Sequence, residues 1–70
     1  MIDYHIGSEI RFELKRQGLK TSDLAVMINC SNSNIYNIMA RPSVDINLLV
    51  RISKALKKNF LLEYANAMNL

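Results

Sequence analysis

The 70-residue sequence has little that could staple a small protein covalently: it contains one cysteine, one histidine, one proline and two glycines. The lone Cys30 excludes an internal disulfide, and Cys30 with His5 provides too few ligands for a zinc site of the usual kind. A chain this short forms one domain, here residues 1–70, and buries only about 60% of the surface that its unfolded form exposes. Its stability must therefore come from helix packing or from association with another chain.

Long apolar runs are missing as well. The longest run, 24–28, is far shorter than the roughly 18 residues that suggest a membrane span. The first five residues have neither the basic start nor the apolar stretch of a signal peptide. We therefore expect a reduced, cytoplasmic protein with no membrane partner.

Catalytic groups are equally sparse. The six carboxylates are scattered, no Ser/His/Asp set can be assembled, and no glycine-rich phosphate loop occurs. Cys30 is expected to be an inert, partly buried thiol and His5 a surface residue. The sequence thus predicts no enzyme, no cofactor, no metal and no small-molecule substrate.

Charge of one sign is in mild excess. Nine Lys and Arg against six Asp and Glu give a net charge of +3 and an isoelectric point near 9.3. That sign suits a partner rich in phosphates, although a solvated surface gives the same balance. The stretch 30–40 carries no charge at all.

Apolar spacing predicts an all-α protein, because no strict apolar and polar alternation of the strand type occurs. Ile6, Ile10 and Leu14 recur every four residues, and the basic residues of the same segment fall on the other side. In the fourth helix the apolar stripe is flanked by Arg51, Lys54 and Lys58, which we expect to form a solvated face. The predicted helices span 7–17, 21–29, 32–40, 45–57 and 60–69.

Capping residues define the expected helix ends. Gly7 or Ser8 is expected to cap the first helix and Thr21 or its neighbour the second, while Ser31 and Asp45 are typical N-caps for the third and fourth. At the other ends, Gly18 and Asn29 tolerate the left-handed conformation that stops a helix, and Pro42 prevents the third helix from continuing.

The segment 21–38 has the spacing of a helix-turn-helix: a helix, a tight turn with a helix-stopping residue, and a second short helix. Its Leu24-Ala25 pair, the turn 29–31, Ile35 and Ile38 resemble the Cro/C1-type, phage-repressor-like family, whose pattern is T-Q-x-x-L-A-x-x-x-G-V-S-x-x-x-I-x-x-I-E-x-G. The resemblance covers about residues 6–62. It implies a five-helix, lambda-repressor-like DNA-binding fold.

Three departures from that pattern stand out. Thr21 occupies the place of a glutamine that holds the phosphate backbone, and Asn29 replaces the turn glycine. Leu14 and Met39 occupy positions where many family members pair a partly buried arginine with a glutamate. Because an apolar pair often replaces a buried ion pair at no cost in stability, the double change is compatible with the fold.

The resemblance makes 32–40 a recognition helix that enters the major groove of DNA. Amides read adenine, whereas guanine is usually read by arginine or lysine, which this helix lacks, so we expect an A·T-leaning half-site. The expected base contacts are Asn32, Ser33, Tyr36 and Asn37, although Tyr36 could equally cover the edge of the core. The expected phosphate contacts are Thr21, Ser31, Arg41 and Ser43.

One small reader contacts only one half-site, so two-fold dimers on palindromes are common. The last helix has more apolar residues than one face can bury, and the expected dimer contacts are Leu61, Leu62, Tyr64 and Met68. The sequence therefore predicts a sequence-specific, homodimeric transcriptional regulator of double-stranded DNA, a repressor associated with the cytoplasmic nucleoid. The alternative is a protein-interaction module on the same fold, antitoxin-like or regulatory, with weak affinity for DNA.

Overall fold

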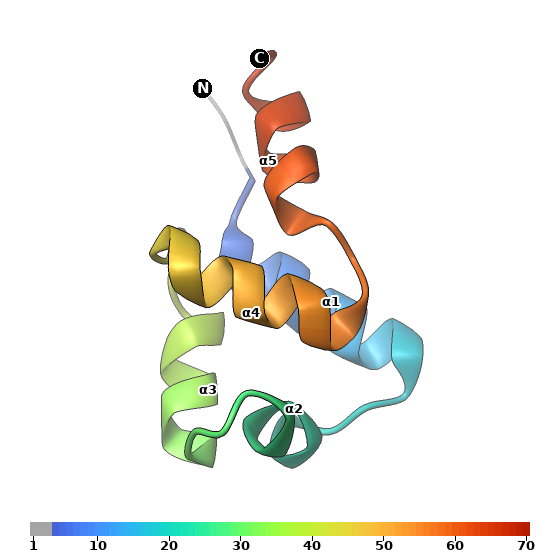
Figure 1. Cartoon of the computed structure of the whole chain (residues 1–70), viewed down its shortest axis with the longest axis vertical. Coiled ribbons are helices and arrows are strands. Elements are labelled where there is room, and N and C mark those ends of the chain that lie inside the picture. Colours follow the sequence, from blue (N-terminus) through green and yellow to red (C-terminus); the bar gives the residue numbers. More distant parts are fainter. Residues whose placement is uncertain (1–3) are drawn as a thin grey trace.

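The computed structural model describes residues 4–70 as five α-helices joined by short connections (Figure 1). No strand occurs in this part of the chain, as the apolar spacing predicted. None of its helices is long and apolar enough to cross a membrane. The helices are α1 (Ile6–Gln17), α2 (Thr21–Met27), α3 (Asn32–Met39), α4 (Ile46–Leu56) and α5 (Phe60–Ala67).

Helix α1 begins one residue earlier than predicted, because the cap is neither Gly7 nor Ser8 but His5. The backbone N–H of Ser8 donates to Nδ1 of His5 at 3.0 Å, so an imidazole serves where a hydroxyl or carboxylate usually does. The histidine expected at the surface is therefore partly buried and structural. At the other end Gly18 has the predicted left-handed backbone, with φ of 71°.

The remaining ends also follow local chemistry. Ser31 accepts a hydrogen bond from the Asn34 N–H and Asp45 accepts one from the Leu48 N–H, which confirms both caps. Helix α2 ends at Met27, two residues before the predicted end, and Asn29 after it has a φ of 57°. Helix α4 ends at Leu56, one residue before the predicted end, and Lys57 after it has a φ of 54°. A left-handed residue cannot continue a right-handed helix.

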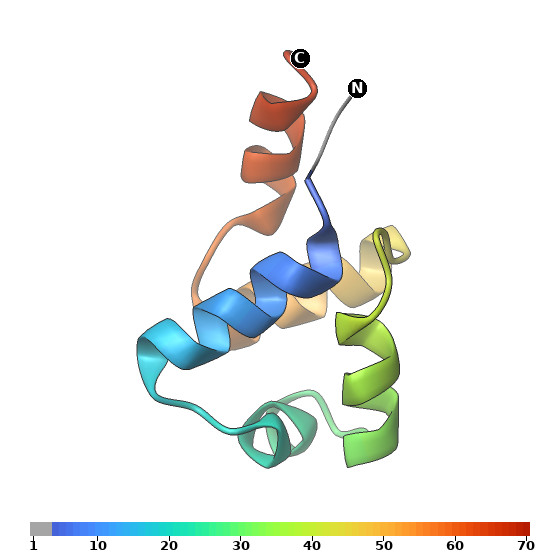
Figure 2. The ribbon, with the colours of Figure 1, turned by 180° about the vertical axis from the view of Figure 1, so that it is seen from behind.

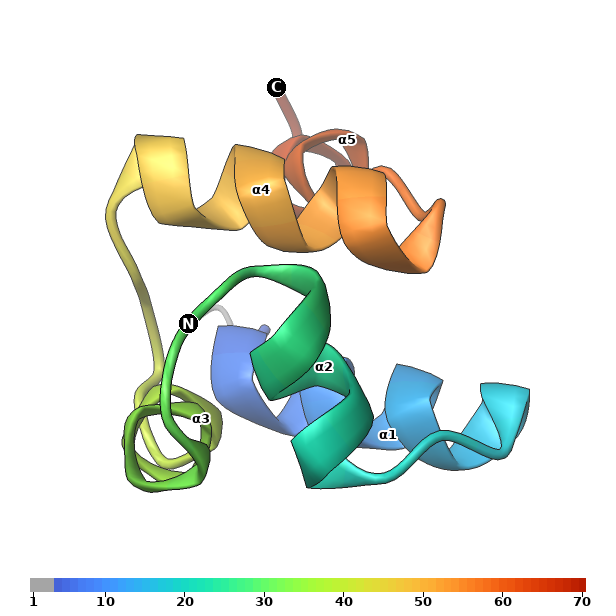
Figure 3. The same cartoon turned by 60° about the horizontal axis from the view of Figure 1, so that its bottom comes forward.

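The core lies where α1, α2, α3 and α4 meet, and the first residue of α5 closes it (Figure 3). Residues that the apolar stripes placed inside are nearly all inside, and Phe60 is completely buried. The buried apolar residues are Ile6, Ile10, Leu14, Leu24, Ala25, Ile28, Ile35, Ile38, Met39, Leu49, Ile52, Leu56 and Phe60.

A glycine lets α1 and the end of α3 approach each other closely. The N–H groups of Ile6 and Gly7 donate to the carbonyl oxygens of Pro42 and Arg41, at 3.0 and 2.9 Å. A Cβ on Gly7 would lie 2.5 Å from the carbonyl carbon of Met39, closer than side chains approach backbone. The contact holds α3 against the start of α1.

A buried carboxylate, which the apolar pattern did not reveal, lies on α1. Glu13 is fully buried and accepts hydrogen bonds from Arg16 and from Gln17 Nε2, while Lys58 Nζ lies 3.5 Å away. The hydrogen bond from Arg16 has the largest effect on the pKa of Glu13 and lowers it, whereas burial raises this pKa by less. Together with Gln17 and Lys58, Arg16 lowers the pKa of Glu13 to about 2. Glu13 is therefore a charged group inside the fold.

Helix α5 rises away from the other four helices (Figures 1 and 2), and Tyr4 lies beside it. The ring of Tyr64 packs edge-on against Tyr4, with centroids 5.7 Å apart, and the Tyr4 hydroxyl donates to Glu63 at 3.0 Å. Burial raises the pKa of Tyr4, and the hydrogen bond to Glu63 raises it further. Lys58 joins Glu63 at 2.8 Å, so polar contacts at its base orient α5.

Candidate functional site

The exposed side of α3 is polar and uncharged. Its buried side, Ile35, Ile38 and Met39, faces the core, which leaves the amides and hydroxyls of the helix outside. All four residues predicted to contact bases are exposed: Asn32, Ser33, Tyr36 and Asn37. Tyr36 is 58% exposed, so its ring does not simply cover the core.

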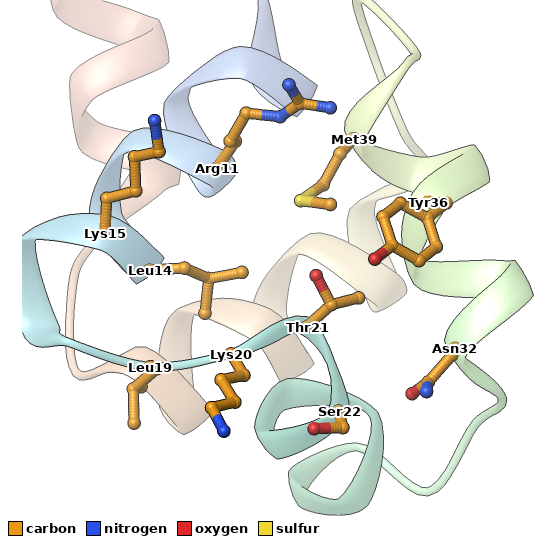
Figure 4. A pocket seen from close by; sticks show the side chains of 10 residues that line it. All are labelled: Arg11, Leu14, Lys15, Leu19, Lys20, Thr21, Ser22, Asn32, Tyr36 and Met39. Atoms are coloured by element: carbon orange, nitrogen blue, oxygen red, sulfur yellow. The ribbon is translucent and has the colours of Figure 1, made fainter.

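Two surface hollows flank this helix on opposite sides. The first, which we name the α1-side hollow, has a volume of about 570 Å³ and is lined by Arg11, Leu14, Lys15, Leu19, Lys20, Thr21, Ser22, Asn32, Tyr36 and Met39 (Figure 4). The second, the α4-side hollow, has a volume of about 290 Å³ and is lined by Ile28, Cys30, Asn34, Asn37, Ile38, Arg41, Leu48 and Arg51. Neither hollow is lined by an aspartate or a glutamate.

The α1-side hollow has an apolar floor and a basic rim. Leu14 and Met39, from α1 and α3, both line it and are both buried, so these two apolar residues lie beside the same hollow. Arg11 extends from α1 toward α3, and the hydroxyl of Tyr36 is directed toward Thr21 (Figure 4). A negatively charged, partly apolar group, such as a sugar-phosphate unit, would match such a surface.

The start of α2 at the edge of this hollow is fixed by its own first turn. The backbone N–H of Lys20 donates to Asp23 Oδ2 at 2.8 Å, and the N-cap is Lys20, the neighbour of Thr21. Thr21 is the first residue of the helix and half-buried, and its hydroxyl faces the hollow (Figure 4).

The α4-side hollow contains an arginine that sequence analysis placed in a solvated face. Arg51 is exposed, yet its Nη2 donates to the carbonyl oxygen of Ile28 at the end of α2. The negative end of the helix dipole attracts a cation there. Lys58 does not belong to the predicted solvated face either, because it pairs with Glu13 and Glu63. Lys54 is exposed as expected.

The other predicted contacts are distributed unevenly. Asn37 and Arg41 line the α4-side hollow together, and Thr21, Asn32 and Tyr36 line the α1-side hollow. The hydroxyl of Ser31 is committed as an acceptor to the cap of α3. Ser33 and Ser43 are exposed but line neither hollow.

Only some of the residues predicted for a dimer contact are exposed enough to contact a second copy. Leu61 and Tyr64 pack against the chain's own core, Met68 is half-buried, and Leu62 is 56% exposed. Leu70 is 91% exposed. The free apolar surface of α5 is therefore centred on Leu62 and the end of the chain.

Several residues of these hollows escaped the sequence analysis. The four-residue spacing of Arg11 and Lys15 puts both on one side of α1 and could have indicated a basic rim. The position of Arg51 had no such signal, because its partner carbonyl is 23 residues away in the chain. Among residues 4–70, no three His, Cys, Asp or Glu side chains gather where they could hold a metal ion.

Comparisons with known proteins do not place the chain in a family. No protein-family model, curated protein or solved structure shows a significant match to it. The function must therefore be inferred from the surface of α3 and the two hollows beside it.

Proposed function

We propose that this protein binds double-stranded DNA in a sequence-specific manner by inserting α3 into the major groove. The observation that carries the proposal is the uncharged, hydrogen-bonding face of α3, exposed between two hollows with basic rims. Base edges are read by such donors and acceptors, and the flanking cations attract the phosphates. The resemblance of 21–38 to the Cro/C1-type helix-turn-helix supports the same function.

The separation of the two kinds of side chain is what this function requires. Phosphate contacts set the position of a protein on the duplex, whereas contacts to bases select the sequence. Here the positive charges lie in the rims, on Arg11, Lys15 and Lys20 on one side and on Arg41 and Arg51 on the other. The centre of the surface, Ser33 and Asn37, carries none.

We further propose that the protein acts as a dimeric repressor that occupies a palindromic operator in the nucleoid, with no catalytic activity. A single α3 reads only one half-site, and a two-fold dimer doubles the contacts. The exposed apolar surface around Leu62 supports a contact between two copies through α5.

Selection of bound duplexes from a random pool at physiological salt tests this function. We expect enrichment of a two-fold palindrome with A·T pairs where Asn37 reaches, because its amide can bond adenine at two positions. In Asn37→Ala the preference at that position should relax, at a cost of about 1–3 kcal/mol in discrimination. The matched control is Asn66→Ala, an exposed amide on α5, which should select the same sequences as the unchanged protein.

Two results of this selection would contradict the proposal in different ways. If no sequence is enriched and duplex binding is weak, α3 does not read bases, and the protein-interaction alternative replaces the proposal. If a sequence is enriched but is dominated by G·C contacts opposite α3, DNA reading stands and the assigned role of its amides is wrong.

A further inference from the structure

The α4-side hollow places Arg51, which the sequence did not indicate as a phosphate contact, beside Arg41, which it did. We propose that it binds a backbone phosphate of DNA through Arg51 and Arg41, and that this phosphate is separate from the one that meets the α1-side hollow. The proposal rests on the proposed function, because it assigns a second anchor to the same DNA-binding surface.

Arg51 is positioned in advance for such a contact. One N–H of its guanidinium donates to the Ile28 carbonyl, which fixes the side chain beside the hollow. An arginine has five N–H donors, and no described residue takes a second one from Arg51. A guanidinium that is already held in place loses less conformational freedom when it binds a phosphate.

The surroundings of Arg51 favour an anion. Arg41 lines the same hollow just beyond the C-terminal end of α3, and the amide of Asn34 adds a neutral donor. No aspartate or glutamate lies between residues 24 and 44, so the segment that forms most of this wall carries a single charge, that of Arg41. Charge-assisted hydrogen bonds from two arginines suit a phosphate.

The placement of the two hollows matches the walls of a major groove. The groove is about 12 Å wide and a helix with its side chains is about 10–12 Å across, so the two phosphate backbones come against the two flanks of an inserted helix. On α3 the flank with Asn32 and Tyr36 borders the α1-side hollow, and the flank with Asn34 and Asn37 borders the α4-side hollow. Each hollow can therefore receive the phosphates of one strand.

A purely structural role for Arg51 makes a different prediction. If Arg51 only stabilises the end of α2, its loss lowers the melting temperature and leaves the number of phosphates contacted unchanged. The salt dependence of DNA binding separates the two roles, because the slope of log K against log salt changes by about 0.9 for each phosphate neutralised.

The test measures binding of a labelled random-sequence duplex by fluorescence anisotropy between about 50 and 200 mM salt. Arg51→Gln should reduce the slope by about 0.9, and the double variant Lys20→Gln/Arg51→Gln by about twice that, because the two side chains face different phosphates. The matched control is Lys57→Gln, which removes one positive charge from the end of α4 that lies farthest from α3 (Figures 1 and 3). Its slope should equal that of the unchanged protein.

Thermal unfolding shows whether each variant is folded. If Arg51→Gln does not fold, Arg41→Gln tests the same hollow, because Arg41 lies in a loop. A steep slope in the unchanged protein that persists in folded Arg51→Gln or Arg41→Gln overturns this inference and leaves the proposed function intact. A double variant no shallower than Arg51→Gln alone overturns the claim of two separate phosphates. Absence of salt-dependent binding by the unchanged protein overturns the proposed function as well.

Discussion

Single residues set the chemistry of this molecule where charge is enclosed, and Glu13 is the clearest case. Its carboxylate is buried, yet Arg16, Gln17 and Lys58 supply the donors that a charged group needs. Gln17 also donates to the Leu56 carbonyl at 2.7 Å, so the cluster ties α1 to the end of α4. A charge on a nominally polar face thus acts as part of the interior.

The lowered pKa of Glu13 gives a signed pH dependence. Because the pKa is about 2 in the folded chain and 4.5 unfolded, the carboxylate stabilises the fold fully above pH 4.5 and loses this contribution as the pH falls toward 2. Glu13→Gln should lower the free energy of unfolding by about 1–3 kcal/mol at neutral pH, since it removes hydrogen bonds to a charged group. Urea unfolding at several pH values should show the difference between the two proteins shrinking below pH 4.5.

Glu9→Gln, at a half-buried position of the same helix, serves only as a check on general charge effects, because Glu9 makes none of the hydrogen bonds and ion pairs that hold Glu13. It should show no such convergence. A Glu13→Gln difference that stays constant from neutral pH to pH 2 would contradict the ionised, bonded state of Glu13.

At the scale of elements, the orientation of α3 depends on how closely α1 approaches it. Three backbone atoms at the end of α3 crowd the position of a Gly7 Cβ, and the Arg41 oxygen would lie 2.7 Å from it. Backbone atoms cannot rotate away as a side chain can. The close contact is therefore a property of glycine at this position and not of the helix as such.

Gly7→Ala tests that contact against helix propensity. Alanine favours a helix by about 1 kcal/mol over glycine, yet we expect the free energy of unfolding to fall by about 3 kcal/mol or more, because overpacking against backbone forces α1 and α3 apart. Denaturant titration measures this change in the free energy of unfolding. Arg11→Ala, at an exposed position of the same helix, should change stability by less than about 0.5 kcal/mol. A Gly7→Ala protein as stable as the original would show that α1 and α3 are not in this contact.

At the scale of the whole molecule, α5 stands apart from the other helices. Phe60 is buried in the core, and Leu61 and Tyr64 pack against that core. Tyr4 and Lys58 hold Glu63, and the rest of α5 rises away from the other helices (Figure 2). The exposed apolar side chains of Leu62 and Leu70 are what a contact with a second copy would cover.

A charged side chain on this surface tests the proposed dimer. Leu62→Glu should shift the protein from dimer to monomer in sedimentation and weaken binding to a palindrome, with little change in stability because the position is exposed. Removal of everything after Asn59 would be a poor test, because it also removes the core residue Phe60. The matched control is Phe12→Glu, which puts the same charge at an exposed apolar position of α1 and should leave sedimentation unchanged. A Leu62→Glu protein that sediments like the original would exclude this surface as the dimer contact.

The sequence by itself determined the helices and most of their ends. Apolar stripes, Ser31, Asp45 and the left-handed Gly18 and Asn29 act within about four residues, the distance over which a helix forms its own hydrogen bonds. Such local effects are visible in a linear pattern. Even His5 as a cap lies three residues from its donor, and only its residue type made it unexpected.

The tertiary structure alone decided which charges are enclosed and which line the surface beside α3. Glu13 looks like any polar residue on a helix until α4 and α5 bring Lys58 to it, and Arg51 looks solvated until the end of α2 lies against it. The physical reason is that electrostatic partners and hollows arise between elements far apart in the chain. Packing sets their distances, and no periodicity within one helix records them.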